Sequence, residues 1–308
     1  MANFTVGTMD DAIKQMEPMK RILLADDVSS EWNQIADVSN YVKLTNVYTD
    51  ASWAALNEGT DFSDATTTHF VEKEYTIKRL MSEAAWNKST LENKWLRNAG
   101  VPGGELTGFA KYQSLLNDVV IEPLQKEKAK QLFVGDGSTT ECSGLTTQLL
   151  ADGDRVVDTT YSGVTGYDYT AGTIIDAVNS HITFVPEDVL DSDDLVMYMS
   201  NANFLMLRAA LIDNGNLVQG PGATPGTSVK SFMYPGALQL EIRGVYGLTG
   251  TDYMILTPKK NLFYIYNILG FDNEVDFRYD SNYKQYRNTV FASYGATYQE
   301  AIYIVTNF

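Results

Sequence analysis

Apolar and polar residues alternate in two stretches near the N-terminus, and this pattern predicts a β-hairpin. The first stretch runs from Tyr41 to Tyr48, and the second, from Phe70 to Leu80, places Val71, Tyr75 and Ile77 on one face. The connection between them is about twenty residues long, and loops of that length are uncommon and usually functional. Because so thin and polar an arm buries too little apolar surface to offset the entropy of ordering it, we expect it to need a neighbouring chain.

The clearest helical pattern lies between residues 111 and 134, where apolar residues recur at i, i+3, i+4 and i+7. We expect charged residues such as Lys128 to be solvated, and Pro123 to kink the helix because it removes a backbone hydrogen bond. The glycines of Gly135-Asp136-Gly137 would end the helix. The stripe expected to face a core consists of Tyr112, Leu115, Leu116, Val119, Val120 and Leu124.

The rest of the chain mixes helix-like and strand-like segments, which predicts an α+β architecture. The C-terminal strands are expected to return and pair with earlier ones. The expected helices cover residues 81–96, 174–185 and 204–211, and the expected strands cover residues 195–199, 238–242, 275–280, 289–294 and 301–306.

Composition narrows the class of protein. The 308 residues, 44% of them hydrophobic and 20% charged, indicate a globular chain of one large or two modest domains. A formal net charge of -16 repels nucleic acid, so the chain could enclose DNA but is not expected to read its bases. A single cysteine excludes an intramolecular disulfide, and no apolar run has the length of a membrane span. We therefore expect folding in a reducing cytosol.

The residues that could carry catalysis or bind a metal form no recognisable set. The two histidines, His69 and His181, lie far apart, and Cys142 is the only thiol, which disfavours a zinc site. No Gly-x-Ser-x-Gly motif is present, and the loop from Gly220 to Gly226 lacks a Walker lysine. We expect neither catalytic residues nor a metal or cofactor. A hydrolase that uses paired carboxylates stays an alternative, because spacing in sequence does not exclude such a pair.

Four features follow one another in a particular order. They are the segment Trp53–Gly59, the strand Val71–Leu80, the helix Tyr112–Phe133 and the exit Gly135-Asp136-Gly137 that leads into Gly144-Leu145. In this order the chain resembles the major capsid proteins of tailed bacteriophages with the HK97-like fold. The resemblance implies an N-terminal arm (1–40), an extended loop (41–80), a peripheral domain with a spine helix (81–140 and 271–308) and an axial domain (141–270).

The same resemblance implies a structural, non-enzymatic subunit. Its copies would form the hexamers and pentamers of an icosahedral head, found in the virion and assembled in the host cytoplasm, which encloses double-stranded DNA without sequence-specific binding. The extended loop would lie across an adjacent subunit, with contacts from Trp53, Leu56, Glu58 and Phe62; the other interpretation of these apolar residues is packing within the arm.

Several partners follow from the resemblance as expectations. Portal and decoration proteins are expected, and because no long helical segment precedes the arm we also expect a separate scaffolding protein. No membrane is involved. A shell protein of an encapsulin-like nanocompartment, which encloses enzymes instead of a genome, is the main alternative.

Overall fold

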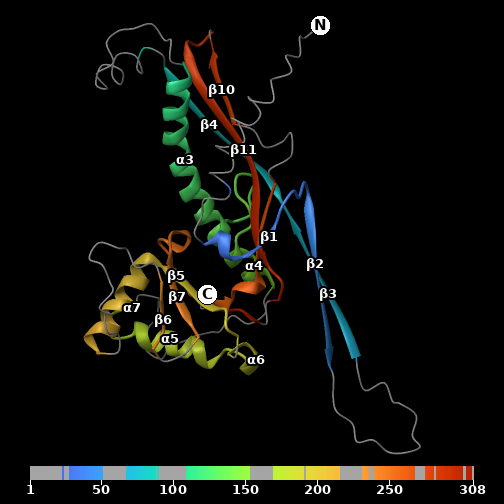
Figure 1. Ribbon diagram of the computed structural model, residues 1–308, viewed down its shortest axis with the longest axis vertical. Helices are drawn as coiled ribbons and strands as arrows, with labels where there is room; N and C mark the ends of the chain where they lie inside the picture. Colours follow the sequence, from blue (N-terminus) through green and yellow to red (C-terminus); the bar gives the residue numbers. More distant parts are fainter. Residues whose placement is uncertain are drawn as a thin grey trace, which may run out of the picture.

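The computed structural model describes residues 23, 28–50, 67–87, 89, 109–152, 169–190, 192–215, 231–235, 239–267, 275–280, 282–300 and 303–306. Figure 1 shows an elongated molecule in which a long helix and a large sheet stand above a smaller α/β unit, while a thin hairpin extends away from both. The α+β class predicted from the sequence is confirmed.

The large sheet is built around its longest strand, β11. This strand pairs antiparallel with β4, β9 and β10, and β1 joins the far side of β9 in parallel. The bounds are β1 Asn33–Ile35, β4 Lys78–Asn87, β9 Leu262–Asn267, β10 Val275–Asp280 and β11 Gln285–Tyr298.

The helix predicted for residues 81–96 is wrong over residues 81–87, which belong to strand β4. Side chains along β4 alternate between half-buried and exposed, and each of its residues pairs with one residue of β11. Ala84 and Ala85 favour a helix when taken alone, but pairing with β11 outweighs this weak preference.

The smaller unit contains the second sheet, in the order β12-β8-β5-β7-β6. Every residue of its central strand β5 is buried, as the sequence predicted, and β12 returns from the C-terminus to pair with β8. Helix α7 begins directly after β5, where the Ser200 hydroxyl accepts a hydrogen bond from the Asn203 amide at 3.2 Å. The bounds are β5 Leu195–Ser200, β6 Ser231–Met233, β7 Glu241–Val245, β8 Ile255–Pro258, β12 Val305–Thr306, α5 Ile174–Thr183, α6 Glu187–Leu190 and α7 Asn201–Asp213.

The long helix α3 spans Phe109–Val134 and continues through Pro123. It ends where the glycines predict, and helix α4 (Leu145–Asp152) closes over that end. The hydroxyl of Thr146 donates to the Phe133 carbonyl at 2.8 Å, and that of Thr147 donates to the Gly135 carbonyl at 2.7 Å. These bonds satisfy carbonyl groups that a helix end leaves without partners.

Lys128 on α3 is buried, so the expectation of a solvated side chain is wrong. Its ammonium group donates to the carbonyl of Leu23 at 2.9 Å, and Tyr264 of β9 donates to the same carbonyl at 2.8 Å. The hydrogen bonds that make this burial possible come from residues far away in the sequence.

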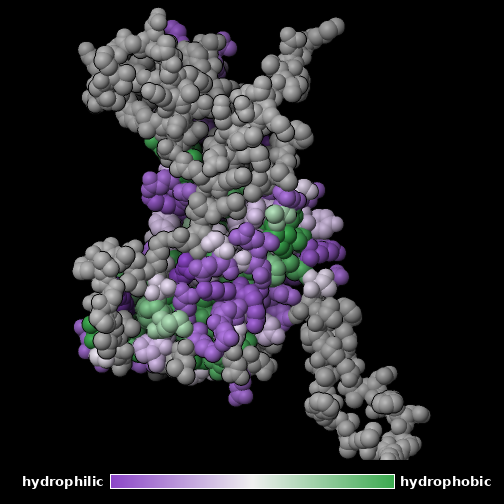
Figure 2. All heavy atoms as spheres, viewed as in Figure 1, coloured by the Kyte–Doolittle hydropathy of each residue, from purple (hydrophilic) through white to green (hydrophobic). Residues whose placement is uncertain are grey.

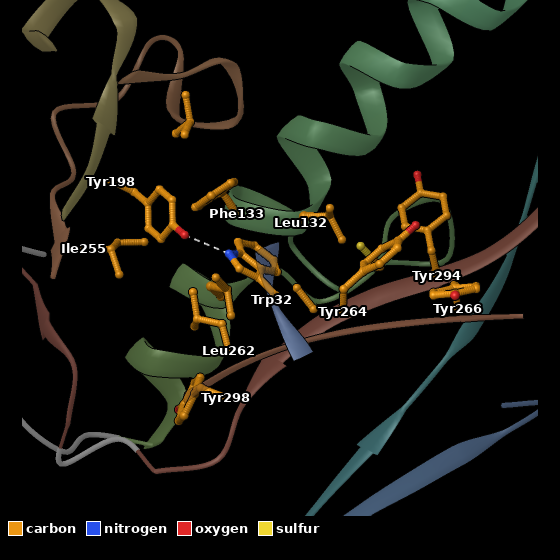
Figure 3. Close-up of a cluster of buried hydrophobic side chains, with 14 of the residues drawn as sticks. Trp32, Leu132, Phe133, Tyr198, Ile255, Leu262, Tyr264, Tyr266, Tyr294 and Tyr298 are labelled. Atoms are coloured by element: carbon orange, nitrogen blue, oxygen red, sulfur yellow. Dashed lines mark hydrogen bonds between the residues drawn. The ribbon is translucent and has the colours of Figure 1, made fainter. Parts of the chain in front are cut away.

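Three aromatic rings join the two units of the molecule. Trp32 packs edge-on against Phe133 and Tyr198, with ring centroids 5.5 and 6.1 Å apart, and Phe133 and Tyr198 lie 5.6 Å apart. The indole N–H of Trp32 donates to the Tyr198 hydroxyl at 2.9 Å (Figure 3). Residues 32–35, within the segment assigned to an arm, thus belong to the core and to the large sheet.

Ion pairs strengthen the same junction. Glu31 contacts Arg243 of β7 and lies 2.7 Å from Lys259, which lies 2.7 Å from Glu241. Burial raises the pKa of Glu31, but hydrogen bonds from Arg243 and Lys259 outweigh it and hold the pKa below its ordinary value. The N-terminal segment is therefore tied to the second sheet by charge as well as by packing.

Gly247 lies in the 3-10 turn that follows β7, Tyr246–Leu248, and packs against α3. A Cβ atom at this position would lie 2.3 Å from the Ala129 carbonyl oxygen and 2.3 Å from the Phe133 ring. A backbone atom cannot move aside as the end of a flexible side chain can. Gly172 offers a contrast, because a Cβ there would meet only the Thr170 hydroxyl, at 3.9 Å.

We expect Gly247→Ala to lower the free energy of unfolding by about 1–3 kcal/mol, the usual cost of overpacking. The matched control Gly172→Ala should stay within about 0.5 kcal/mol of the wild type. Urea denaturation followed by tryptophan fluorescence measures both. Equal midpoints for the two variants would contradict the packing of this junction.

Candidate assembly interface

The hairpin consists of β2 (Tyr41–Asp50) and β3 (Thr67–Thr76), which pair antiparallel over their full length. The predicted hairpin is confirmed. Among the described strands, β2 and β3 pair only with each other, and Figure 1 shows them extending well beyond the body. A two-stranded sheet of this kind is at best marginally stable without further packing.

The base of the hairpin has two different faces. Leu44 and Tyr75 lie on the inner face and are buried, and Tyr75 packs with Ile77 and Ile265 of the body. On the outer face Lys43 lies 3.8 and 4.0 Å from the carboxylates of Glu72 and Glu74. These outer pairs are solvent-exposed and contribute little stability, so the inner face holds the hairpin.

Tyr75 fixes the hairpin to β11. Its hydroxyl donates to the Ser143 carbonyl at 3.1 Å, and its ring occupies the space above Gly295, where a Cβ would lie 2.3 Å from the hydroxyl oxygen. Burial raises the pKa of Tyr75 far above its ordinary value, so the hydroxyl keeps its proton. The missing side chain of Gly295 is what admits the ring.

Lys73 makes a second attachment on the same face. Its ammonium lies 2.8 Å from an Asp152 carboxylate oxygen and 3.1 Å from the centre of the Tyr298 ring. The Tyr298 hydroxyl donates to the same oxygen of Asp152. Burial lowers the pKa of Lys73, whereas the bonds from Lys73 and Tyr298 outweigh burial at Asp152 and hold that pKa below its ordinary value.

The structure describes only part of the apolar stripe that the sequence predicts on the long helix. Val120 and Leu124 are half-buried and pack against the core. Val119 is 48% exposed, so its placement in the core stripe is wrong; it lies one position away from Val120, on a side of the helix that the described residues leave open. The side chains of three further members lie outside the described residues: Tyr112, Leu115 and Leu116.

A hollow of about 220 Å³ lies between α3 and the sheet. Leu124 and Glu127 of α3 form one wall, and Met81 and Val290 of the sheet form another. Met81 is 63% exposed at its edge. Among the described residues that line this hollow, Glu127 is the one carboxylate, so they do not supply the pair of acids that glycoside hydrolysis needs.

Further large apolar side chains are exposed on the smaller unit. In the view of Figure 2, the described part of the molecular surface is mostly hydrophilic, with smaller hydrophobic patches among the hydrophilic residues. Single exposed apolar residues are ordinary, but groups of them mark contact surfaces. Those of the smaller unit are Phe184, Leu190, Leu205, Ile212, Met233 and Tyr246.

Cys142 and His181, two candidates for catalysis or metal binding, are both buried. Cys142 is buried, and burial raises the pKa of its thiol to about 12. His181 is buried on α5, with Nδ1 2.7 Å from the Ala177 carbonyl oxygen. Within the described ranges, no three or more His, Cys, Asp or Glu side chains are grouped to hold a metal ion. No described helix combines the length and hydropathy of a membrane span.

The predicted loop contacts Trp53, Leu56, Glu58 and Phe62 lie outside the described residues. The structure instead places Lys73, Asp152 and Tyr298 together, three residues that no sequence motif connects. The sequence holds one indication of the position of Lys73. It lies two and four residues before the apolar Tyr75 and Ile77, so an extended strand places all three on the same face.

No family model and no curated protein matches the chain. Solved structures do match. A chain of the satellite phage P4 procapsid with its size determination (Sid) protein has a TM-score of 0.58 at 13% identity, covering 99% of this chain and 92% of that one. A chain from the capsid of an empty GTA particle has a TM-score of 0.60 at 11% identity, covering 91% and 96%. This chain has the HK97-like capsid fold.

The HK97-like fold extends over nearly the whole chain. A virus-like particle from Pyrococcus furiosus also matches, with a TM-score of 0.51 at 8% identity, covering 96% of this chain and 97% of that one. Because identities this low leave few shared side chains, the likeness establishes the architecture and not the contacts of individual residues.

The buried His181 generates a pH prediction. Burial lowers its pKa below the ordinary value of 6.5, and Nε2 has no hydrogen-bond partner among the described residues. As pH falls below 6.5, the unfolded chain binds a proton that the folded chain does not. Stability should then fall by about 1.4 kcal/mol per pH unit until the pKa of the folded state is reached.

The variant His181→Gln cannot titrate, so we expect it to lack this component of the pH dependence. Urea denaturation of both proteins between about pH 7.5 and pH 5 measures the difference in unfolding free energy. Curves that stay parallel through this range would show that His181 is not a buried neutral group.

Proposed function

We propose that the chain is the major capsid protein of a tailed bacteriophage, a structural subunit that assembles into an icosahedral head around double-stranded DNA. The observation that carries this proposal is the hairpin. The contacts with the body that the structure describes lie at its base, and it extends a long, thin sheet that has no partner strand among the described residues. A second copy of the chain would supply the missing contact, and repetition of a weak contact stabilises a closed shell.

The parts of the chain take their proposed roles from the same fold. Residues 41–80 are the extended loop, and Trp53, Leu56, Glu58 and Phe62 are its contacts with the adjacent subunit. Residues 141–270, apart from strand β9 of the large sheet, form the axial domain, through which copies meet in hexamers and pentamers; its exposed side chains, such as Leu205 and Ile212, support this. Residues 81–140 and 271–308 form the peripheral domain. Residues 1–40 contain the N-terminal arm, although Trp32 and strand β1 within this range belong to the body.

The strongly acidic composition supports enclosure of DNA without sequence-specific binding. A net charge of -16 repels phosphate groups, so the inner wall of the shell would confine the genome more than grip it. Scaffolding, portal and decoration proteins are proposed as partners, with assembly in the host cytoplasm and no enzymatic step by this chain.

A nanocompartment shell that encloses enzymes is the second candidate. The likeness to the virus-like particle from Pyrococcus furiosus favours it. Nucleic acid and protein analysis of shells purified from a native source distinguishes the two, because packaged DNA supports the capsid and a second, enzymatic protein supports the nanocompartment.

Replacing Trp53–Ser63 by a glycine–serine linker of equal length should leave a folded subunit that does not close shells. The linker keeps the length of the loop but removes its large apolar residues, and with them the contact that drives assembly. Negative-stain microscopy and light scattering measure the shells, and circular dichroism measures the fold.

The wild-type chain prepared in parallel is the control, and it should form closed shells. Normal shells from the linker variant would contradict the role of this segment. A wild-type chain that stays monomeric at high concentration, with its portal and scaffolding partners supplied, would contradict the proposed function.

A further inference from the structure

Lys73 and its cross-strand partner Leu44 are the outermost inner-face residues of the hairpin whose side chains the structure describes. Beyond them the strands continue away from the body to Asp50 and Thr67. At about 3.4 Å per residue, the described part of the hairpin extends roughly 20 Å past Lys73. The contacts of Lys73 therefore lie where the hairpin leaves the body.

The two residues that receive Lys73 come from different elements of the body. Asp152 is the last residue of α4, and Tyr298 is the last residue of β11. Gln148 of α4 joins these elements, since its amide donates to the Ala296 carbonyl at 2.7 Å and accepts from the Thr297 hydroxyl at 2.8 Å. Lys73 thus binds to a platform made of two elements, α4 and β11, that are hydrogen-bonded to each other.

Beside the apolar packing of Val42 and Leu44, Tyr75 and Lys73 make the two polar attachments of the hairpin to the body that the described residues show. Tyr75 is seated against Gly295 and bonded to Ser143, and Lys73 lies two residues, or about 7 Å, further along the strand. One point of attachment allows the hairpin to tilt, whereas two points fix its direction. Tyr75 lies roughly 27 Å from the end of the described strand at Thr67, so a tilt of about 10° about Tyr75 would move that end by about 5 Å.

We propose that Lys73, Asp152 and Tyr298 form a latch that fixes the direction of the hairpin relative to the body, and through it the curvature of the shell. This inference rests on the proposed function, because curvature has meaning only for a subunit that assembles. The direction of the hairpin decides where it meets the next copy, so the latch residues are positioning residues.

The polar character of the latch fits this role. Lys73 is 20% exposed at the side chain, so the ammonium is largely withdrawn from water and its direction is set by Asp152 and by the ring beneath it. Tyr298 is buried, and its hydroxyl donates to the same Asp152 oxygen that Lys73 contacts. Removing the ammonium would leave the platform intact and free the hairpin to tilt about Tyr75.

The test compares Lys73→Met with Lys43→Met. Both remove a lysine from the base of the hairpin, but the carboxylates that Lys43 pairs with among the described side chains, those of Glu72 and Glu74, belong to the hairpin itself. Spin labels on Thr45→Cys and Leu205→Cys, both at exposed positions, report the distance between hairpin and body by electron paramagnetic resonance. The measurement uses unassembled subunits, and electron microscopy then measures the diameters of the shells.

We expect Lys73→Met to broaden the distance distribution about twofold, because one of two attachment points is lost. Lys43→Met should match the wild type, and Lys73→Arg should restore most of the narrow distribution. Shells of Lys73→Met should vary in diameter. If that variant does not fold, Asp152→Asn removes the other half of the pair and should give the same result.

An unchanged distance distribution in Lys73→Met and Asp152→Asn would overturn the latch. A broadened distribution with shells of normal, uniform diameter would overturn its effect on curvature. Absence of shells from the wild-type chain supplied with its portal and scaffolding partners would instead refute the proposed function, and the spin-label distances would still decide whether the latch exists.

Discussion

The contact among Trp32, Phe133 and Tyr198 is the interaction on which the rest of the structure depends. It joins the N-terminal segment, the end of the long helix and the central strand of the second sheet at one buried point. Gly247 allows the second unit to come close enough for this contact. Once the two units are fixed, β11 and α4 are held where they can receive the hairpin, so the direction of the projection begins in this core.

Local patterns in the sequence predicted several elements. The hairpin and the helix from 109 to 134 show their period within ten or so residues, and the strand from 195 to 200 shows as a short continuous apolar run. The strand β4 was missed because its partner β11 lies about two hundred residues away, and nothing local outweighs the helix preference of its alanines. For the same reason Lys128 was placed in solvent, since its acceptor on Leu23 is 105 positions distant.

The candidate site could be predicted only as a segment. Alternation along β3 identifies an inner face. Asp152, however, lies 79 residues beyond Lys73, and Tyr298 lies a further 146 residues along the chain, so only the fold brings the three together. Likewise a helical stripe cannot tell Val119 from Val120 until the sheet that covers one of them is known. Sequence therefore indicated that the hairpin projects, while the structure shows what holds it at its base.

The distribution of charge connects this architecture with an acidic container. Lys73, Arg243 and Lys259 are partly or largely buried against the chain's own carboxylates, at the junctions where the hairpin and the N-terminal segment meet the body. Because these cations pair with carboxylates of their own chain, they are not available to contact a partner, and the remaining surface is more negative. Copies of such a chain repel one another at long range, so association has to come from shape and apolar contact at short range. In the proposed shell, a thin projection whose direction is fixed by the body would meet that requirement, because it would bring a small apolar area to one defined place on the next copy.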